Sequence, residues 1–262
     1  MTRITILGAG SIAPSEKRFG SGIYIEAEET KLLIDPGPGT IYKLIRLAVN
    51  PLSLTAVLIS HFHLDHISDL LPLIMMWCYD EEGKPSPRPK NLHLIGPTGL
   101  QKLVEQVISI DAFSYLTNPM QVNRFLKLDE MLHGDTRQVG ECKITAAEVL
   151  HLNGLAYRIE HRGKNIVYSG DTVPDQRLID LAKNCDLLIH ECSFPHQQLI
   201  GKHTSEKQLA EITAKAKPQK ILVTHLYPSW NGREHEIIEA LRQAGMPPEN
   251  VIVGQDLTTV DV

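Results

Sequence analysis

Four side chains of metal-binding type lie within six residues of one another, in the segment Ser60-His61-Phe62-His63-Leu64-Asp65-His66. The apolar run Ala56–Ile59 precedes them and is typical of a buried strand. In an extended segment His61 and His63 point to the same side, because side chains alternate along a strand. Imidazole nitrogen and carboxylate oxygen are ligands of zinc and similar divalent ions. A histidine-rich surface turn would explain one or two of these residues, whereas four on this spacing indicate a metal site.

Other residues of ligand type lie just past the ends of short β-rich runs elsewhere in the chain. They are Asp35 after Lys31–Ile34, His151 after Lys143–Val149, Asp171 after Asn165–Tyr168, His190 and Glu191 after Leu187–Ile189, and His225 after Lys220–Val223. Strand ends that gather at one edge of a sheet system are where α/β proteins build their sites. One such residue would be a coincidence, whereas five strand ends predict a shared pocket.

Short β-branched runs alternate with amphipathic stretches, which is the pattern of a layered α/β fold. Besides the runs already named, the sequence predicts strands at Arg3–Leu7, Gly22–Ala27, Leu92–Ile95 and Val251–Val253. It predicts helices at Thr40–Ala48, His66–Tyr79, Thr98–Ile108, Asp175–Ala182, Ser205–Lys215 and Arg233–Ala244. Only Glu28-Glu29-Thr30 joins the second strand to Lys31–Ile34, and strands joined so closely are antiparallel. We therefore expect mixed sheets.

The composition is that of a globular chain of 262 residues, of which 42% are hydrophobic and 22% charged. It fits neither a disordered nor a fibrous chain. The longest apolar run, Leu70–Tyr79, covers about half of the roughly 20 residues that cross a bilayer. The N-terminus lacks the features of a secretory signal, and the four cysteines form no C-x-x-C pair. We therefore expect a cytoplasmic protein without a membrane partner.

No linker, low-complexity tract or internal repeat divides the chain, so we expect a single domain over residues 1–262. The net charge is −5 and no run of Lys or Arg stands out, which argues against a large nucleic-acid footprint. The segment Gly8–Ala13 is similar to a dinucleotide-binding fingerprint, which works only where it opens a helix. Because Pro14–Gly20 follows without a helical apolar period, we interpret Gly8–Ala13 as a glycine-rich turn.

The chain resembles the hydrolases of the metallo-β-lactamase fold, and within them the ribonuclease Z branch. The resemblance covers nearly the whole chain, because Asp35, the block His61–His66, His151, Ser169-Gly170-Asp171-Thr172 and His225 match the five motifs of that superfamily in order. The H-x-H-x-D-H block is highly specific for this superfamily when the other four motifs accompany it. The resemblance implies a four-layer αββα sandwich, with a dinuclear site at one edge of two mixed sheets.

The same resemblance implies a set of ligands for two divalent ions, zinc in the first place and otherwise manganese or iron. His61, His63 and His151 would hold the first ion, Asp65, His66 and His225 the second, and Asp171 would bridge them. Asp35 would orient the loop that carries the block. Without the resemblance, an Asp-Pro-Gly turn explains Asp35 equally well. A metal-bridging hydroxide at neutral pH would then attack the substrate.

At two ligand positions the chain differs from other branches of the superfamily. The commonest zinc β-lactamases carry a cysteine where this chain has Asp171, and flavodiiron oxidoreductases carry a glutamate where it has His63. The segments His190–Phe194 and His203-Thr204-Ser205 are similar to segments of ribonuclease Z that help to protonate the leaving oxygen. By this resemblance His203 would be the general acid, with Glu191 and Asp65 as its partners. An ordinary surface histidine is the alternative for His203, and a structural histidine is the better interpretation of His190.

The tRNA-processing members of the branch carry a protruding arm between the third-motif histidine and the bridging aspartate. Here only nineteen residues (152–170) separate His151 from Asp171, and their pattern predicts a strand, a turn and a second strand. We therefore expect a phosphodiesterase that acts on a small phosphodiester or a short nucleic-acid end. A lactone or thioester hydrolase of glyoxalase II type and a non-catalytic metal-binding scaffold are the alternatives.

The loop Glu81–Lys90, with Met75, Met76 and Trp77 before it, could flank the site, although Met and Trp are more often core residues. A homodimer is expected by analogy with similar proteins.

Overall fold

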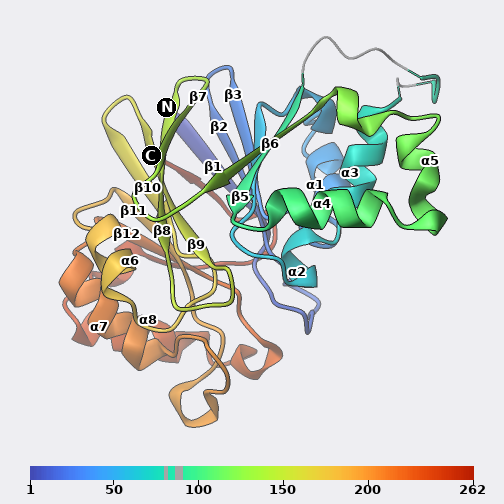
Figure 1. Ribbon diagram of the computed structural model, residues 1–262. Helices are drawn as coiled ribbons and strands as arrows, with labels where there is room; N and C mark the ends of the chain where they lie inside the picture. The colour runs from blue at the N-terminus through green and yellow to red at the C-terminus, as the bar shows by residue number, and fades with distance from the viewer. Residues whose placement is uncertain (80–81, 86–90) are drawn as a thin grey trace.

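The strands of this computed structural model form two sheets that lie face to face; residues 1–79, 82–85 and 91–262 are described here (Figure 1). The first sheet has the order β14 (Thr259–Asp261), β1 (Thr2–Gly8), β2 (Gly22–Ala27), β3 (Thr30–Ile34), β4 (Ala56–Leu58), β5 (Leu92–Pro97), β6 (Leu126–Met131). The second has the order β13 (Val251–Val253), β12 (Lys220–Thr224), β11 (Leu187–Glu191), β10 (Lys164–Tyr168), β9 (Leu155–His161), β8 (Cys142–Glu148), β7 (Thr136–Val139).

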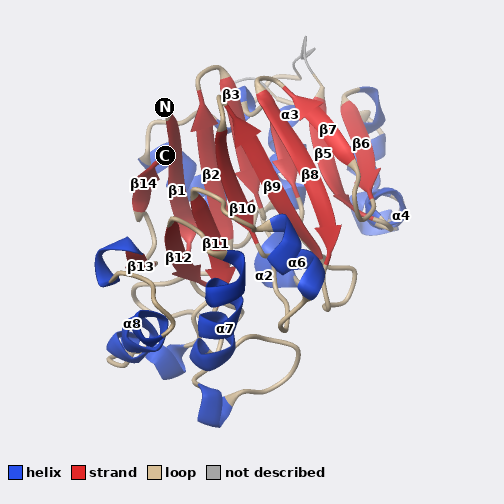
Figure 2. Cartoon of the chain, turned by 90° about the vertical axis from the view of Figure 1, so that its left-hand side faces the viewer, coloured by secondary structure: helices blue, strands red, loops and turns tan. Residues whose placement is uncertain are grey.

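Both sheets are mixed, and they are mixed in the same way. In the first, β14, β1, β2 and β3 pair antiparallel, whereas β3, β4, β5 and β6 pair parallel. In the second, β7 to β10 pair antiparallel, whereas β10 to β13 pair parallel. The expectation of mixed sheets is confirmed. Because β1 pairs with β14, the two ends of the chain lie side by side (Figures 1 and 2).

Helices cover the outer faces of the sheets and give four layers. They are α1 (Thr40–Arg46), α2 (Leu64–Ile67), α3 (Leu70–Trp77), α4 (Leu100–Ile108), α5 (Ser114–Thr117), α6 (Gln176–Leu181), α7 (Glu206–Ala216) and α8 (Glu234–Gln243). Figure 1 shows α1, α3, α4 and α5 on the side of the first sheet and α6, α7 and α8 on the side of the second. The αββα sandwich expected from the sequence is confirmed. None of the helices in the described ranges is long and apolar enough to cross a membrane.

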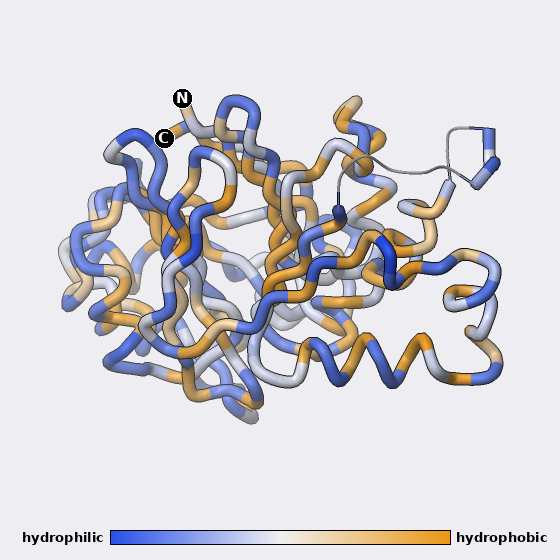
Figure 3. The backbone as a smooth tube through the Cα atoms, turned by 45° about the horizontal axis from the view of Figure 1, so that its top comes forward, coloured by the Kyte–Doolittle hydropathy of each residue, from blue (hydrophilic) through white to orange (hydrophobic). Residues whose placement is uncertain are grey.

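The core is divided in the same way. Inward residues of both sheets, such as Ile25, Leu32, Ile144 and Tyr157, form one buried cluster between the sheets. A second cluster lies between the second sheet and its helices, and a third between the first sheet and its helices. Both faces of the central strands are therefore buried, which is why they read as continuous apolar runs rather than alternating ones. Figure 3 shows these apolar stretches along the strands in the middle of the molecule.

The helix expected over His66–Tyr79 is divided into two. The helix α2 ends at Ile67 and α3 begins at Leu70, with Asp69 between them. The backbone N–H of Asp69 donates to Pro36 O (2.8 Å), and its carboxylate accepts from the N–H of Ile41 (3.0 Å). These contacts with the segment after β3 hold Asp69 outside a continuous helix, which no local propensity in the sequence indicates. Most of the segment Glu81–Lys90 lies outside the described residues.

Candidate metal centre

Most of the candidate site residues lie at or just past the ends of strands, and they meet at one edge of the two sheets. Asp35 follows β3, the block His61–His66 follows β4, and His151 lies in the turn between β8 and β9. Asp171 follows β10, Glu191 is the last residue of β11, and His225 follows β12. The backbone of Asp35 and that of His225 are both left-handed, with φ of 55°. A non-glycine residue seldom adopts this conformation, and such residues cluster at functional sites.

Gly170 shows how closely the backbone approaches the site. Its φ is +57°, and a Cβ there would lie 2.8 Å from Leu155 O and 3.1 Å from the Cβ of Ser60. Glycine alone fits both the conformation and the space, so it lets β10 bring Asp171 against the loop after β4.

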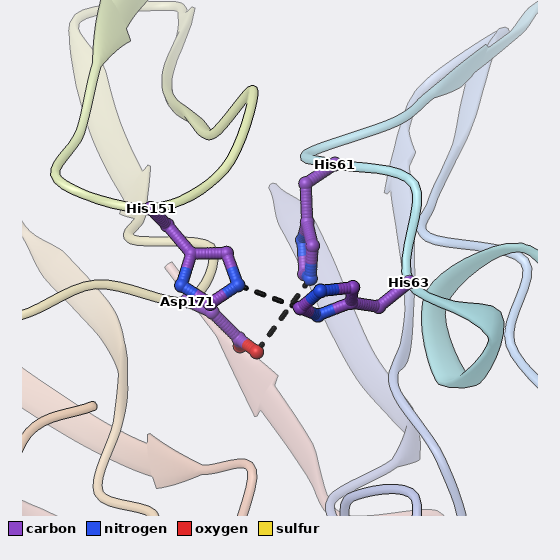
Figure 4. A group of neighbouring side chains, drawn as sticks. All are labelled: His61, His63, His151 and Asp171. Atoms are coloured by element: carbon purple, nitrogen blue, oxygen red, sulfur yellow. Dashed lines mark hydrogen bonds and ion pairs between the residues drawn. The ribbon is translucent and has the colours of Figure 1, made fainter. Parts of the chain in front are cut away.

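The first candidate group consists of His61, His63, His151 and Asp171, whose ligand atoms all lie within 4.8 Å of one another. Figure 4 shows the four side chains converging from three different segments. His63 Nδ1 lies 3.3 Å from His151 Nε2, and His61 Nε2 lies 3.7 Å from Asp171 Oδ2. His61 and Asp171 are buried, whereas His151 is half-buried and His63 is exposed. This group therefore opens to solvent.

The second candidate group consists of Asp65, His66 and His225, all buried. His225 Nε2 lies 3.3 Å from Asp65 Oδ2 and 3.3 Å from Asp171 Oδ2. His66 Nε2 lies 3.5 Å from the same atom of Asp171. Asp171 thus borders both groups, which is the position that the sequence analysis assigns to it. His203 forms a third cluster with Asp171 and His225.

In four of the histidines the Nδ1 atom contacts an oxygen atom outside the cluster of candidate ligands. The Nδ1 atoms contact Ser60 Oγ in His61 (3.0 Å), Asp35 Oδ2 in His66 (2.8 Å), Lys202 O in His151 (3.3 Å) and Ser193 Oγ in His225 (2.9 Å). An oxygen acceptor at Nδ1 keeps a proton on that nitrogen. The Nε2 atoms then face the cluster, as in metal-ligating histidines: that of His61 has no hydrogen-bond partner, and those of His151 and His225 lie 3.3 Å from His63 Nδ1 and from Asp65 Oδ2.

Asp35 is the centre of a buried network behind the second group. Its carboxylate accepts from the N–H and the hydroxyl of Ser60 (2.7 Å each) and from the hydroxyl of Tyr168 (2.8 Å), in addition to His66 Nδ1. It is completely buried. Asp35 therefore ties β3, β4 and β10 together at the point where the block begins, and it orients His66 without pointing its carboxylate into the group.

Glu191 and Ser193 form a second network, on the opposite side. The carboxylate of Glu191 accepts from Thr172 N (2.9 Å) and Ser193 N (3.1 Å), and Ser193 Oγ donates to it at 2.6 Å. His203 Nδ1 lies 3.1 Å from Glu191 Oε1 and 3.1 Å from Ser193 Oγ. Glu191 thus fixes His203 beside the cluster. Asp65, the other expected partner of His203, contacts His225 and acts on His203 only through its charge.

The electrostatics follow from burial and from these contacts. Burial alone would raise the pKa of Asp171, but the charges of His225 and His66 hold it well below its usual range. Burial and the neighbouring charge of His66 lower the pKa of His61, so this ring stays neutral. Burial alone would lower the pKa of His203, but the hydrogen bond to Glu191 and the charge of that carboxylate raise it above its ordinary value. Neutral imidazoles and ionised carboxylates are the forms that bind divalent cations.

Two unpaired buried atoms show that the cluster fits a metal. His61 Nε2 and Asp171 Oδ1 are buried without a hydrogen-bond partner. A buried polar atom without a partner destabilises the fold by about 1–3 kcal/mol, and native proteins seldom leave one unexplained. Both atoms face a group of nitrogen and carboxylate donors of the kind that binds zinc and similar ions. The donor set therefore fits divalent cations.

A cavity of about 320 Å³ opens onto the cluster. Besides site residues it is lined by Ile12, Leu64 and Tyr227. The sequence does not mark Ile12 and Tyr227, nor Ser193 and Tyr168, as site residues, because common hydroxyl and apolar residues carry no spacing signal. Met75 and Met76, suggested as flanking residues, line a separate apolar cavity beside α1 and α3, and Trp77 is buried in the outer core.

A family model described as "Anti-Pycsar protein Apyc1" matches residues 2–243. The chain belongs to this family. Its curated relatives include ribonuclease Z of Mycolicibacterium gilvum, which is 28% identical over 285 residues that span 100% of this chain and 96% of the relative. Both the fold and this relative confirm the similarity to ribonuclease Z and to the metallo-β-lactamase fold that the motifs indicate.

Solved structures agree with this fold. The metallo-β-lactamase fold protein YhfI of Bacillus subtilis superposes with a TM-score of 0.78 at 22% identity, covering 99% of this chain and 98% of its own. The Zn²⁺-bound PqqB of Methylobacterium extorquens superposes with a TM-score of 0.72 at 15% identity, covering 99% and 100%. The chain is a metal-dependent hydrolase of this fold.

Proposed function

We propose that the protein is a dinuclear metal-dependent phosphodiesterase that hydrolyses a small phosphodiester or the end of a short nucleic acid. The observation that carries this proposal is the convergence of seven nitrogen and carboxylate side chains in two adjoining groups, with the His203–Glu191 pair beside them. The name of the ribonuclease Z relative supports phosphodiester chemistry.

The proposed ligands follow from the two groups. His61, His63 and His151 would hold one divalent ion, Asp65, His66 and His225 the other, and Asp171 both. Zinc suits this donor set best, and manganese or iron would also accept it. When bound, such ions lower the pKa of water towards about 7 and stabilise negative charge on phosphoryl oxygens. The zinc in PqqB supports the choice of metal.

The chain itself would supply the proton for the leaving group. An alkoxide leaves slowly unless it is protonated, and an imidazolium can donate that proton near neutral pH. His203 is suited to this role because Glu191 fixes its Nδ1 (3.1 Å) and favours its charged form. The Nε2 atom then remains to face the substrate. We propose His203 as the general acid, Glu191 as the residue that positions it, and Asp65 as a ligand whose charge also acts on His203.

The size of the substrate follows from two observations. The segment between His151 and Asp171 is the hairpin of β9 and β10, so no arm extends there. The cavity of about 320 Å³ is at the lower end of the range for small-molecule sites. Both favour a compact phosphodiester over a folded tRNA.

Hydrolysis of bis(p-nitrophenyl) phosphate by protein loaded with zinc or manganese tests the proposal. We expect metal-dependent turnover that Asp65→Ala reduces by about a thousandfold. Asp111→Ala, which removes an exposed acid far along the chain from the site, is the matched control and should keep full activity. A metal-loaded but inactive wild-type protein would contradict the proposal, and hydrolysis of lactones or thioesters would then be measured.

A series of leaving groups tests the role of His203. With an alkyl leaving group we expect His203→Ala to lower kcat by about a hundredfold, because general acids contribute about 10²–10⁴-fold. With p-nitrophenolate, which leaves without a proton, the loss should be less than about tenfold. An equal loss for both leaving groups would assign His203 to metal binding instead, since it also borders Asp171 and His225.

A further inference from the structure

The turn between β8 and β9 carries His151 out of the second sheet. His151 N donates to Val149 O (2.8 Å) and Gly154 N donates to His151 O (3.2 Å), which closes the turn on itself. Leu150 and Leu152, on either side of His151, are exposed. Outside the candidate ligands, the hydrogen bond of the imidazole is a long one, from Nδ1 to a backbone carbonyl (3.3 Å). The position of His151 therefore depends on what holds the backbone of the turn.

Asp175 joins this turn to α6. It is 5% exposed and is the N-cap residue of α6, where its Oδ1 accepts from the N–H of Arg177 (2.9 Å). Burial alone would raise the pKa of Asp175, but hydrogen bonding from Arg177 and from the backbone N–H of Leu150 lowers it. Leu150 directly precedes His151. Both oxygens of an ionised carboxylate accept hydrogen bonds, so Asp175 holds the end of the helix and the turn together.

Arg177 connects the same two elements a second time. Its Nη2 lies 2.8 Å from Asp175 Oδ2, and its Nη1 lies 3.3 Å from Oε2 of Glu148, the last residue of β8. The side chain of Val149 is buried in the same core cluster as Leu178 of α6. Arg177 and Glu148 are 36% and 49% exposed, and ion pairs of this kind contribute little to stability. Buried Asp175 is therefore the stronger connection.

The segment that leads to Asp175 also carries Asp171. Only three residues (172–174) separate the two aspartates, and within this link Thr172 N donates to Glu191 Oε1 (2.9 Å). The link is therefore short and fixed. Asp171 and His151, two donors of the first candidate group, are thus set relative to each other through Asp175.

We propose that Asp175, assisted by Arg177, is a positioning residue for His151: by holding the β8–β9 turn against the segment that follows Asp171, it sets the affinity of the first candidate group for its ion. This proposal rests on the dinuclear centre of the proposed function. Asp175 does not itself belong to either group of candidate ligands, and it acts through the backbone of the turn. The second candidate group should not respond, because the β8–β9 turn contributes none of its donors.

Competition for zinc with a chromophoric chelator measures the two affinities without any substrate. His151→Ala identifies the affinity of the first group, because it removes a ligand of that group. In Asp175→Asn the same affinity should fall about tenfold, while the other affinity should stay within about twofold. The amide has a single acceptor oxygen, so it cannot serve α6, Arg177 and Leu150 at once.

Asp186→Asn is the matched control. Asp186 is 9% exposed, and its carboxylate likewise accepts from a backbone N–H, that of Asn165 (2.9 Å), and pairs with a basic side chain, that of Lys164 (2.9 Å). Lys164 and Asn165 begin β10, at its opposite end from Asp171. Asp186→Asn should lower the melting temperature about as much as Asp175→Asn and leave both zinc affinities unchanged. An equal loss of zinc affinity in the two variants would reflect lost stability and overturn the proposal.

A double-mutant cycle tests the route from Asp175 to the ion. If Asp175 acts through His151, Asp175→Asn should weaken zinc binding at the first group by less than about twofold in a chain that already carries His151→Ala. A full tenfold loss in that background would mean that Asp175 acts through another ligand, and the proposal would be wrong.

The zinc affinities separate this proposal from the proposed function. A protein that shows the expected affinities but hydrolyses no phosphodiester would contradict the proposed function and leave the role of Asp175 intact. A wild-type protein with fewer than two zinc sites, or an unchanged affinity of the first group in Asp175→Asn, would contradict the role of Asp175.

Discussion

The two candidate metal groups share Asp171 but differ in how they are held. In the second group Asp65, His66 and His225 are buried, and Asp35 and Ser193 fix the rings of His66 and His225 through hydrogen bonds of 2.8 and 2.9 Å. In the first group His63 is exposed and its Nδ1 contacts only the ring of half-buried His151. The second group is therefore a preformed cage, whereas the first is an open face.

This difference suggests that the two groups have different roles. Hydrogen-bonded outer residues raise the affinity of a metal site and fix its geometry. An ion held by the buried group should thus bind tightly and exchange slowly, while an ion at the open group faces the cavity through which a substrate enters. Substitutions in and behind the two groups test this difference.

The largest effect is expected for Asp171→Ala, because this residue borders both groups. We expect metal content to fall from two ions to one or fewer per chain, and hydrolysis of bis(p-nitrophenyl) phosphate to fall by more than about a thousandfold. Elemental analysis and steady-state rates measure the two quantities. Asp180→Ala, at an exposed acid on α6, is the control. Retention of both ions in Asp171→Ala would show that the groups are independent.

Asp35→Asn should act on the buried group alone. The amide cannot accept all of the hydrogen bonds that Ser60, Tyr168 and His66 now donate. We expect metal affinity at the second group to fall by about 10–100-fold, with the first group little changed. Competition with a chromophoric chelator resolves the two affinities. An equal loss at both groups would mean that Asp35 supports the whole edge of the sheets and not one cage.

A smaller effect is expected for Ser193→Ala. Its hydroxyl links His225, Glu191 and His203, so its loss leaves His225 Nδ1 without an acceptor. We expect about a tenfold loss of metal affinity at the second group, and a further loss of activity with alkyl leaving groups because His203 is less well positioned. Ser109→Ala, at an exposed serine after α4, serves as the comparison. An unchanged metal affinity would show that Ser193 does not support the second group.

The same contrast explains how much the sequence predicts. The block His61–His66 can be recognised from the sequence because its four donors lie within one short segment. Most of the other candidates can be recognised because each lies at the end of a predictable strand. Ser193, Ser60 and Tyr168 cannot be recognised from the sequence. A hydroxyl group becomes part of the site only through neighbours that are distant along the chain, here Asp35 for Ser60 and Tyr168 and His225 for Ser193. The candidate ligands of both groups are thus visible in the sequence, and Asp35 is added by the resemblance, whereas the hydroxyl groups that support the rings are not.

The fold shows a similar limit. The central strands could be predicted from their apolar runs, but β6 and β7 could not, because most of their residues are half-exposed or exposed and show no clear alternation. The break between α2 and α3 depends on the contacts of Asp69 with the segment after β3. A single domain, a homodimer and a cytoplasmic location stay predictions.

Calorimetric titration of metal-free wild-type protein with Zn²⁺, with hydrolysis of bis(p-nitrophenyl) phosphate measured at each step, tests the dinuclear centre most directly. We expect two ions per chain with separable affinities, the tighter one lost selectively in Asp35→Asn, and hydrolysis that rises only as the second ion binds. Full activity with a single ion per chain, or two bound ions without hydrolysis, would contradict a dinuclear phosphodiesterase.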